Sequence, residues 1–349
     1  MATRHPYLVT HTSSPVSRHG VIAVAQITLV EAINLALKHE MERDSGVVVL
    51  GQDVGVDGGV FRATLGLSER FGPERVVDTP LAEALIAGMT IGMAVEGLKP
   101  IAEIQFSGFA YTVIDQIVNH AGRMRHRTRG RLSCPMVLRT PCGAGIHAPE
   151  HHSESPEAMF AHIPGIRVVY PSSPRRAYGL LLAAIRDPDP VVFLEPTRLY
   201  RLFREEVADN GEALALDACF TLREGTDVTL VTWGPMVPET LAAADELAEH
   251  GVAAEVIDVA TLKPLDMDTI LASVARTGRC VVVTEAPRTA SFASEIAAGL
   301  ADEGLLTLLA PVQRVTACDV VVPFSRLEDQ YIPGKARIVA AAKKALAFS

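Results

Sequence analysis

Residues 47–51 read Val47-Val48-Val49-Leu50-Gly51, four large apolar residues followed by a glycine. Such a short and continuously apolar run, rich in β-branched side chains, predicts a strand that is buried on both faces. Just upstream, apolar residues recur at every fourth position, which predicts a helix over residues 29–43 with Thr28 as its N-cap. Together these segments predict the first helix and strand of an α/β protein.

The same alternation of helical segments and short apolar runs continues up to residue 200. Strands of this kind, separated by helices, favour a parallel sheet with helices on both faces. Further strands are predicted at Val76–Val77, Ile101–Phe106, Met136–Arg139, Arg167–Tyr170 and Val191–Leu194, with helices over residues 81–95, 112–127 and 174–186.

The length of 349 residues exceeds what one hydrophobic core usually supports, so we expect two domains. Residues 201–217 lose the alternation and are interpreted as a linker. We therefore expect a flexible tail over residues 1–25, an α/β domain over 26–200 and a second α/β domain over 218–349. The second domain is predicted to contain strands at Val228–Val231, Glu255–Val259, Cys280–Thr284 and Val312–Val315, and helices over residues 238–250, 266–276, 292–302 and 336–347.

Composition and charge restrict the class of partner. The net charge of −9 argues against nucleic acid as the main partner, because that role needs a basic surface. Five arginines between Arg123 and Arg131 are the local exception, interpreted as a solvated surface or as a subunit or phosphate contact. Five cysteines without a Cys-x-x-Cys pair argue against a disulfide framework and against a zinc site.

The location of the protein is indicated only weakly by the sequence. No apolar run is long enough to span a membrane. Arginine outnumbers lysine 26 to 6, a bias that favours the bacterial cytoplasm. Residues 1–30 contain no acidic residue and faintly resemble a transit peptide. The mitochondrial matrix is therefore the alternative location, less favoured than the bacterial cytoplasm.

Three polar or aromatic features follow predicted strands, and the carboxyl ends of parallel strands are where ligands bind. Glu83 lies at a helix start, predicted to be capped by Thr79, where the helix dipole favours the carboxylate and burial favours the neutral acid. It either shares a proton with a ligand or is a helix-start carboxylate without chemistry. Phe109 is placed to stack on a heterocycle or to pack in the core.

The third feature is the loop over residues 145–155, which contains three histidines and two glutamates. A histidine is the natural acid or base near neutral pH. The loop lacks the order His-Glu-x-x-His, so zinc is a weaker interpretation than acid–base catalysis or a loop without chemistry.

Taken together, these segments resemble the beta subunits of thiamine-diphosphate-dependent 2-oxoacid dehydrogenases, over about residues 27–346. The segments 102–106 and 194–201 look more like branched-chain than pyruvate enzymes. A pyruvate or acetoin enzyme and a non-catalytic α/β regulatory subunit are the alternatives. The segments that carry the resemblance are residues 51–54, 58–62, 79–83, 114–116, 152–153, 155–160 and 193–196.

The resemblance implies roles for matching residues. Glu83 would bond N1′ of the aminopyrimidine ring of thiamine diphosphate and promote deprotonation of the thiazolium C2. Phe109 would pack against that ring, and Gln105 is a further expected cofactor-binding residue. His152 would transfer a proton as the acyl group passes to lipoamide. Backbone groups that match a monovalent-cation loop, with K⁺ as the expected ion, belong to Met136, Ala184, Ile185, Asp187 and Asp189.

Departures from the family pattern weaken some of these expectations. Gln52 stands where many members have Glu, and Glu150-His151 replaces the more usual pair before His152. Residues 318–323 depart from the usual Asp-Thr-Pro, which affects expected contacts with a lipoyl acyltransferase core.

Thiamine enzymes hold Mg²⁺ and the diphosphate on a Gly-Asp-Gly segment followed by a downstream Asn. Residues 56–59 approach this pattern but lack the first glycine and a suitable Asn. The chain is therefore expected to carry half of a site, completed by an alpha subunit in an α2β2 assembly.

Overall fold

A seven-stranded sheet with the order β12-β6-β7-β5-β4-β2-β3 forms the first domain of the computed structural model, which describes residues 24–348. All neighbouring strands in it are parallel except β12, which pairs antiparallel with β6. The strands are β2 (Val47–Gly51), β3 (Val76–Asp78), β4 (Lys99–Glu103), β5 (Val137–Cys142), β6 (Arg167–Val169), β7 (Val191–Pro196) and β12 (Thr261–Lys263).

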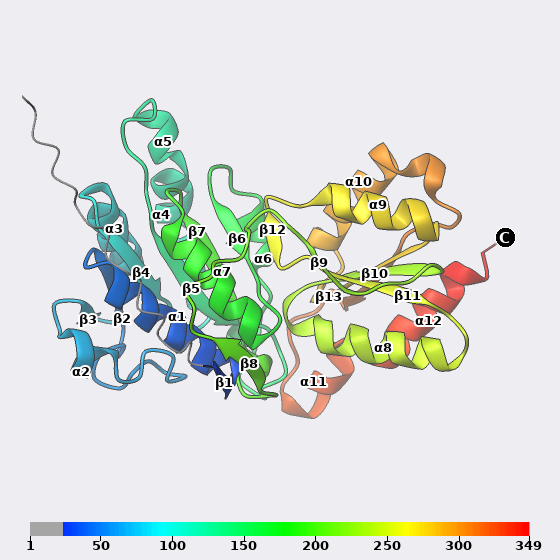
Figure 1. Cartoon of the computed structure of the whole chain (residues 1–349), viewed down its shortest axis with the longest axis horizontal. Helices are drawn as coiled ribbons and strands as arrows, with labels where there is room; N and C mark the ends of the chain where they lie inside the picture. The colour runs from blue at the N-terminus through cyan, green and yellow to red at the C-terminus, as the bar shows by residue number, and fades with distance from the viewer. Residues whose placement is uncertain (1–23, 349) are drawn as a thin grey trace, which may run out of the picture.

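Helices cover both faces of this sheet, as the continuously apolar strands predicted (Figure 1). Successive strand residues alternate between the two faces. Val49 packs in the core shared with α1 (Leu29–Arg43) and α7 (Pro174–Arg186), while Leu50 packs in the core on the opposite face. The helices on that opposite face include α3 (Glu83–Val95), α4 (Ile114–Asn119) and α6 (Glu157–Ala161).

Helix α1 begins where its sequence predicted. The Thr28 hydroxyl accepts a hydrogen bond from the Glu31 backbone N–H, and the Thr28 backbone N–H donates to the Glu31 carboxylate at 2.7 Å. This reciprocal capping box satisfies two backbone donors that a helix start otherwise leaves unpaired. The predicted cap is confirmed.

Two predicted helices differ from the structure. The helix predicted over 81–95 begins at Glu83, and Thr79 does not cap it: its N–H bonds the Gly51 carbonyl and its hydroxyl has no partner among the described residues. The segment 112–127 is broken into η1 (Phe109–Val113), α4, η2 (Ala121–Arg123) and α5 (Met124–Arg127). The break occurs at His120, whose ψ of −68° with φ of −122° leaves the helical region.

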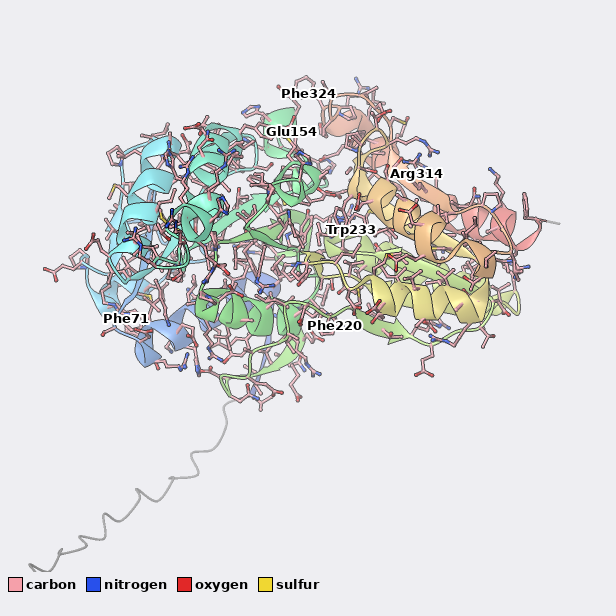
Figure 2. All side chains as sticks on the ribbon, turned by 90° about the horizontal axis from the view of Figure 1, so that it is seen from above. Phe71, Glu154, Phe220, Trp233, Arg314 and Phe324 are labelled. Carbon is pink, nitrogen blue, oxygen red and sulfur yellow. The ribbon has the colours of Figure 1, made fainter. Side chains whose placement is uncertain are left out.

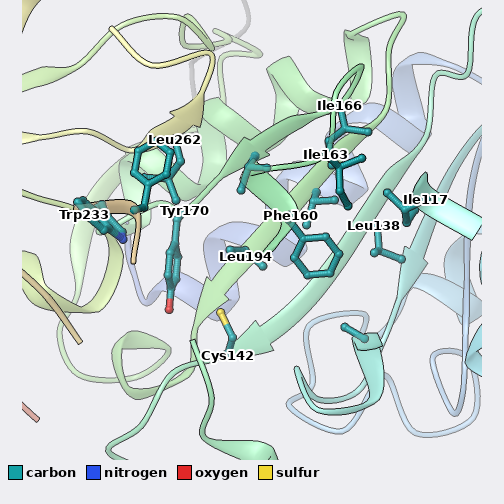
Figure 3. Packing of buried hydrophobic residues seen from close by; sticks show 14 of the residues in the cluster. Ile117, Leu138, Cys142, Phe160, Ile163, Ile166, Tyr170, Leu194, Trp233 and Leu262 are labelled. Carbon is teal, nitrogen blue, oxygen red and sulfur yellow. The ribbon is translucent and has the colours of Figure 1, made fainter. Parts of the chain in front are cut away.

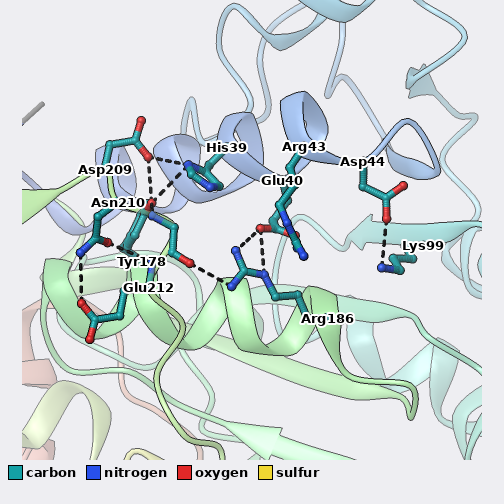
Figure 4. Close-up of polar contacts among 11 residues, drawn as sticks. His39, Glu40, Arg43, Asp44, Lys99, Tyr178, Arg186, Asp209, Asn210 and Glu212 are labelled. Atoms are coloured by element: carbon teal, nitrogen blue, oxygen red, sulfur yellow. Dashed lines mark hydrogen bonds and ion pairs between the residues drawn. The ribbon is translucent and has the colours of Figure 1, made fainter. Parts of the chain in front are cut away.

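The predicted linker is not structureless. Within residues 201–217, β8 (Glu205–Ala208) pairs antiparallel with β1 (Val24–Ile27). The expectation of a flexible tail over residues 1–25 is therefore wrong for residues 24–25, and residues 1–23 lie outside the described part of the chain. After β8, Asp209 accepts hydrogen bonds from Tyr178 and from His39, which ties this segment to α7 and α1 (Figure 4).

A five-stranded sheet with the order β14-β13-β10-β11-β9 forms the second domain. Helices again lie on both faces, with α9 and α10 on one side and α8 and α12 on the other (Figure 1). Its elements are β9 (Phe220–Arg223), β10 (Val228–Thr232), α8 (Val237–Glu249), β11 (Ala254–Asp258), α9 (Met267–Thr277), β13 (Cys280–Pro287), α10 (Phe292–Glu303), β14 (Gln313–Ala317), α11 (Ser325–Tyr331) and α12 (Lys335–Leu346).

The two domains share one apolar core. Strand β12 comes from the second domain but extends the first sheet, a crossing that the expected boundaries 26–200 and 218–349 do not include. Figure 3 shows Trp233 and Leu262 of the second domain beside Tyr170 of the first. Figure 2 places Trp233 in the middle of the molecule, between the domains. Because this core is continuous, the second domain can fix the position of loops that belong to the first.

Candidate functional site

Three loops meet at the carboxyl ends of parallel strands in the first domain. One follows β3 and leads to Glu83, one follows β4 and leads to Phe109, and one follows β5 and contains η3 (Glu150–His152). Neighbouring parallel strands bring their following loops to one edge of the sheet. The structure therefore places Glu83, Phe109 and His152 at the same edge.

The ring of His152 is the centre of an aromatic cluster. It stacks on Phe106, with ring centroids 3.8 Å apart and planes 17° from parallel. Phe109 meets the same imidazole edge-on at 5.4 Å, and His151 adjoins it at 4.0 Å. The sequence had placed Phe106 in a strand and in the segment 102–106 of the family resemblance, without a role at the site; β4 ends at Glu103, which frees Phe106 to face the histidine.

A glycine allows the two loops of this cluster to approach each other. Gly108 lies against the backbone of His151, and a Cβ placed on it would collide with the His151 carbonyl oxygen. Any side chain at residue 108 would therefore push η3 away from the β4 loop. The Ser107 hydroxyl adds a hydrogen bond across the same gap, to the Glu154 carbonyl at 3.3 Å.

His152 is held as a neutral imidazole near physiological pH. Its ring is half-buried, and its Nδ1 is buried without a partner within residues 24–348. Burial, and then the neighbouring His151, lower the pKa of His152 below its ordinary value. A neutral imidazole with an unpartnered nitrogen can accept a proton or donate one to a ligand in the cluster.

Glu83 begins α3 and is half-buried. Among the described residues, its carboxylate has no hydrogen-bond or ion-pair partner in this chain. The Thr79 hydroxyl nearby in sequence is buried and also without a partner. Helix α3 and η1, which begins at Phe109, pack in the same apolar core. Among the described residues, two polar groups at this edge of the sheet are thus left without partners.

The side chain of Gln105 forms hydrogen bonds to other residues of this chain. Its side-chain amide donates to the Gln52 carbonyl at 3.4 Å and to the Asp53 carboxylate at 3.3 Å. It therefore joins the loop after β2 to the loop after β4. Its expected contact with a cofactor stays a prediction.

A charged network lies buried beneath the site. Arg139 in β5 donates to Glu103 in β4 and, through two nitrogens at 2.7 and 2.9 Å, to Glu195 in β7. The Tyr200 hydroxyl also donates to Glu195. Burial raises the pKa of Glu103, while the adjacent guanidinium opposes that shift. One cation shared by two carboxylates on the strands either side of it fixes the edge of the sheet from which the loops emerge.

The five residues of the expected cation loop lie together at the start of β7. The Met136 carbonyl accepts the Val191 N–H at 2.9 Å, and the Ala184 carbonyl faces the Asp187 N–H at 3.4 Å. Both aspartates are already paired with arginines, Asp187 with Arg167 and Asp189 with Arg125. Cation binding by Met136, Ala184, Ile185, Asp187 and Asp189 stays a prediction.

Two of the three histidines in the loop over residues 145–155 have different contacts. His147 is exposed and its ring lies 2.8 Å from the Glu328 carboxylate, while His152 belongs to the aromatic cluster.

In the described residues 24–348, no three His, Cys, Asp or Glu side chains gather as a metal site would require. None of the helices over the same residues is long and apolar enough to cross a membrane.

Comparison with known proteins decides the family. The transketolase pyrimidine-binding domain matches residues 25–202, and the transketolase C-terminal domain matches residues 218–338. The chain is 49% identical over 325 residues to a pyruvate dehydrogenase E1 component subunit beta from Bacillus subtilis, covering 93% of this chain and 100% of the relative. The chain belongs to the family of E1 beta subunits.

Further relatives and a solved structure agree with this family. E1 beta subunits of pyruvate dehydrogenase from Staphylococcus epidermidis and Staphylococcus aureus are 48% and 46% identical over the same coverage. A split-gene transketolase, described as an inactive beta4 tetramer, superposes with a TM-score of 0.71 at 25% identity, covering 93% of this chain and 99% of that one. The expected resemblance to thiamine-diphosphate-dependent 2-oxoacid dehydrogenase beta subunits is confirmed.

The finer expectation of a branched-chain enzyme is not supported. Each of these E1 beta relatives is a pyruvate dehydrogenase subunit. The structure gives the two motifs a structural role: Glu103, Glu195 and Tyr200 belong to the buried network around Arg139 rather than to an open pocket. These E1 beta motif residues hold the sheet together, so they carry little information about the substrate.

Proposed function

We propose that this E1 beta chain is the beta subunit of a pyruvate dehydrogenase, which decarboxylates pyruvate and passes the acyl group to lipoamide. The observation that carries the proposal is the stacking of His152 on Phe106 at the strand ends that also present Glu83. The pyruvate dehydrogenase relatives, at 46–49% identity over 100% of their length, support pyruvate as the substrate. Their organisms are bacteria, which agrees with the expected bacterial origin.

The groups present fit one half of a thiamine diphosphate site. Within residues 24–348 the Glu83 carboxylate and the buried Thr79 hydroxyl lack partners, and Phe109 offers an aromatic surface at the same edge of the sheet. These are a proton-holding group, a hydroxyl and a flat apolar surface, which suit an aminopyrimidine ring. When bound, thiamine diphosphate supplies the electron sink for decarboxylation.

Three residues of this chain are assigned roles in the reaction. Glu83 would hold a proton at N1′ of the aminopyrimidine, and Phe109 would pack against that ring. His152, neutral because of its lowered pKa, would transfer a proton when the acyl group moves to lipoamide. The aromatic rings around His152 limit water at that proton transfer.

An alpha subunit is proposed to complete the site in an α2β2 assembly. The sequence lacks the Gly-Asp-Gly segment with downstream Asn that would hold Mg²⁺ and the diphosphate, so those ligands are assigned mainly to the alpha subunit. Helix α3, which begins at Glu83, leaves Leu85 48% and Met89 38% exposed, with Leu81 just before it 70% exposed. An exposed apolar helix face beside a half site suits a subunit interface.

Coexpression with the alpha subunit tests the proposal. The purified complex should decarboxylate pyruvate faster than 3-methyl-2-oxobutanoate, with reductive acylation of a lipoyl domain as the second readout. A preference for the branched-chain substrate would contradict the pyruvate assignment. Titration calorimetry of the chain alone should show poor binding of thiamine diphosphate with Mg²⁺, and micromolar affinity would contradict the half site.

A further inference from the structure

The loop over residues 143–155, which carries His152, is anchored mainly by the second domain. Its base is closed by a hydrogen bond from the Gly143 N–H to the Glu154 carbonyl at 2.9 Å. Apart from the single turn of η3, the loop has no regular secondary structure. Figure 2 shows Glu154 at the end of this loop and Phe324, which precedes α11, on the same edge of the molecule.

Glu328 in α11 binds the loop with both carboxylate oxygens. One oxygen accepts the Gly145 N–H at 2.6 Å, and the other accepts the His147 N–H at 2.9 Å. The His147 ring nitrogen Nδ1 lies 2.8 Å from that second oxygen. The carboxylate is buried, with 1% of the side chain exposed. Hydrogen bonds from backbone N–H groups to a buried carboxylate are among the stronger ones in proteins.

The backbone of the loop is shaped to make these bonds. Gly145 has a φ of +99° and His147 a φ of +57°, both outside the conformations that most residues prefer. This arrangement turns two N–H groups, two residues apart, toward one carboxylate. Without that carboxylate, the loop would lose the interaction that offsets its unfavourable backbone conformation.

A second carboxylate of the same domain supports the loop at its ends. Glu285 in β13 accepts the Ala144 N–H and the Ser155 hydroxyl, each at 3.1 Å. Ala144 also packs against Val322 and Tyr331 in a small apolar cluster. The loop is therefore held from the second domain at residues on both sides of His152.

We propose that Glu328 is a positioning residue, which keeps the histidine loop in the conformation that stacks His152 on Phe106. The inference rests on the proposed function for the chemistry at His152, but the anchoring of the loop does not depend on the substrate. Without the hydrogen bonds from the loop to Glu328, His152 would stack on Phe106 only part of the time. It would thereby impair acyl transfer to lipoamide more than decarboxylation.

Hydrogen exchange on the assembled α2β2 complex tests the anchoring without activity. Glu328→Gln keeps the side-chain volume but replaces one acceptor oxygen by a donor. Peptides covering residues 143–155 should exchange about 10-fold faster or more, as loss of a charge-assisted hydrogen bond implies. Glu255→Gln is the matched control, because Glu255 is buried in the same domain and pairs with Arg276 at 2.6 Å without touching the loop.

A double-mutant cycle then tests whether Glu328 acts on acylation through His152. In the wild-type background, Glu328→Gln should slow acylation of a lipoyl domain by about 10-fold or more while decarboxylation with an artificial electron acceptor changes little. In the His152→Ala background, Glu328→Gln should have no further effect on acylation, because the group that it positions is gone. Glu328→Asp, which keeps the charge but shortens the reach, replaces Glu328→Gln if that variant does not assemble.

Two results would overturn the inference. One is unchanged exchange of residues 143–155 in a Glu328 variant that assembles. The other is an equal further loss of acylation in the His152→Ala background, which would indicate a general structural effect. A complex that decarboxylates no 2-oxoacid would instead contradict the proposed function, and the exchange experiment would still decide whether Glu328 anchors the loop.

Discussion

The imidazole of His152 lies face to face with the Phe106 ring, with centroids 3.8 Å apart, at the carboxyl edge of the first sheet. This stacking determines which of two adjacent histidines lies inside the site. His151 is exposed, whereas His152 is half-buried with its Nδ1 turned inward. The geometry therefore supports His152 as the functional histidine.

Replacing the two histidines separately should give unequal effects. His152→Ala should slow acylation of lipoamide by about 10²–10⁴-fold, the usual loss when an acid–base group is removed. Decarboxylation with an artificial acceptor should be less affected, because we assign that step to Glu83. His151→Gln, on the exposed neighbour, is the matched control and should be mild in both assays. The reverse order of severity would assign the role to His151.

Glu83→Gln should leave the assembly intact but remove the proton held at the aminopyrimidine. The carboxylate has no partner among the described residues of this chain, so its loss should not disturb the fold. Steady-state decarboxylation of pyruvate should fall about 10²–10⁴-fold, with gel filtration as the check on assembly. Activity within a few-fold of wild type would mean that another group activates the cofactor.

Leu85→Asp should weaken assembly with the alpha subunit. Leu85 lies in the first turn of α3, two residues after Glu83, and is 48% exposed. A carboxylate at this position would have to be desolvated at an interface. Analytical ultracentrifugation should show a smaller species than the α2β2 complex. Leu306→Asp is the control, because Leu306 is 100% exposed in the second domain, and it should assemble normally. Equal assembly by both variants would remove α3 from the interface.

The contribution of Glu157 to the stability of the fold should fall as the pH rises from 4.5 to about 7. Burial, with the nearby Glu285 adding to it, raises the pKa of Glu157 to about 7. A folded-state pKa above the unfolded value of 4.5 stabilises the fold at low pH, and this contribution is lost as the pH rises through about 7. The full shift corresponds to about 3 kcal/mol.

Glu157→Gln should remove most of this dependence, since the amide does not titrate. Urea unfolding at several values between pH 5 and pH 8 would measure it. The difference in unfolding free energy between the variant and the wild type should grow with pH in favour of the variant. A constant difference over this range would show that Glu157 does not titrate there.

Much of the fold follows from local sequence. The apolar run Val47–Leu50 and the similar runs after it could be predicted as buried parallel strands, because each residue packs on one of two covered faces. The cap of α1 was also predictable, since Thr28 and Glu31 are three residues apart and each bonds to the other's backbone and side chain. In these cases the deciding contacts lie within a few residues of the chain.

The site depended on contacts between residues far apart in sequence. Motif order indicated Glu83, Phe109 and His152, but only the tertiary structure showed that Phe106 stacks on His152 and that Gly108 permits the approach. Glu328 follows His147 by 181 residues, so no local pattern could show that it binds this loop.

The motifs that suggested a branched-chain substrate show the same division. From sequence alone, Glu103 and Glu195 were polar residues at strand ends and seemed informative about the pocket. Their partner Arg139 lies on the strand between them, and all three side chains are buried together. Sequence determined the strands and the order of the motifs, because those follow from hydrophobic period and spacing. Which polar residues face a ligand was decided by tertiary packing, because a buried charge must pair with whatever the fold brings beside it.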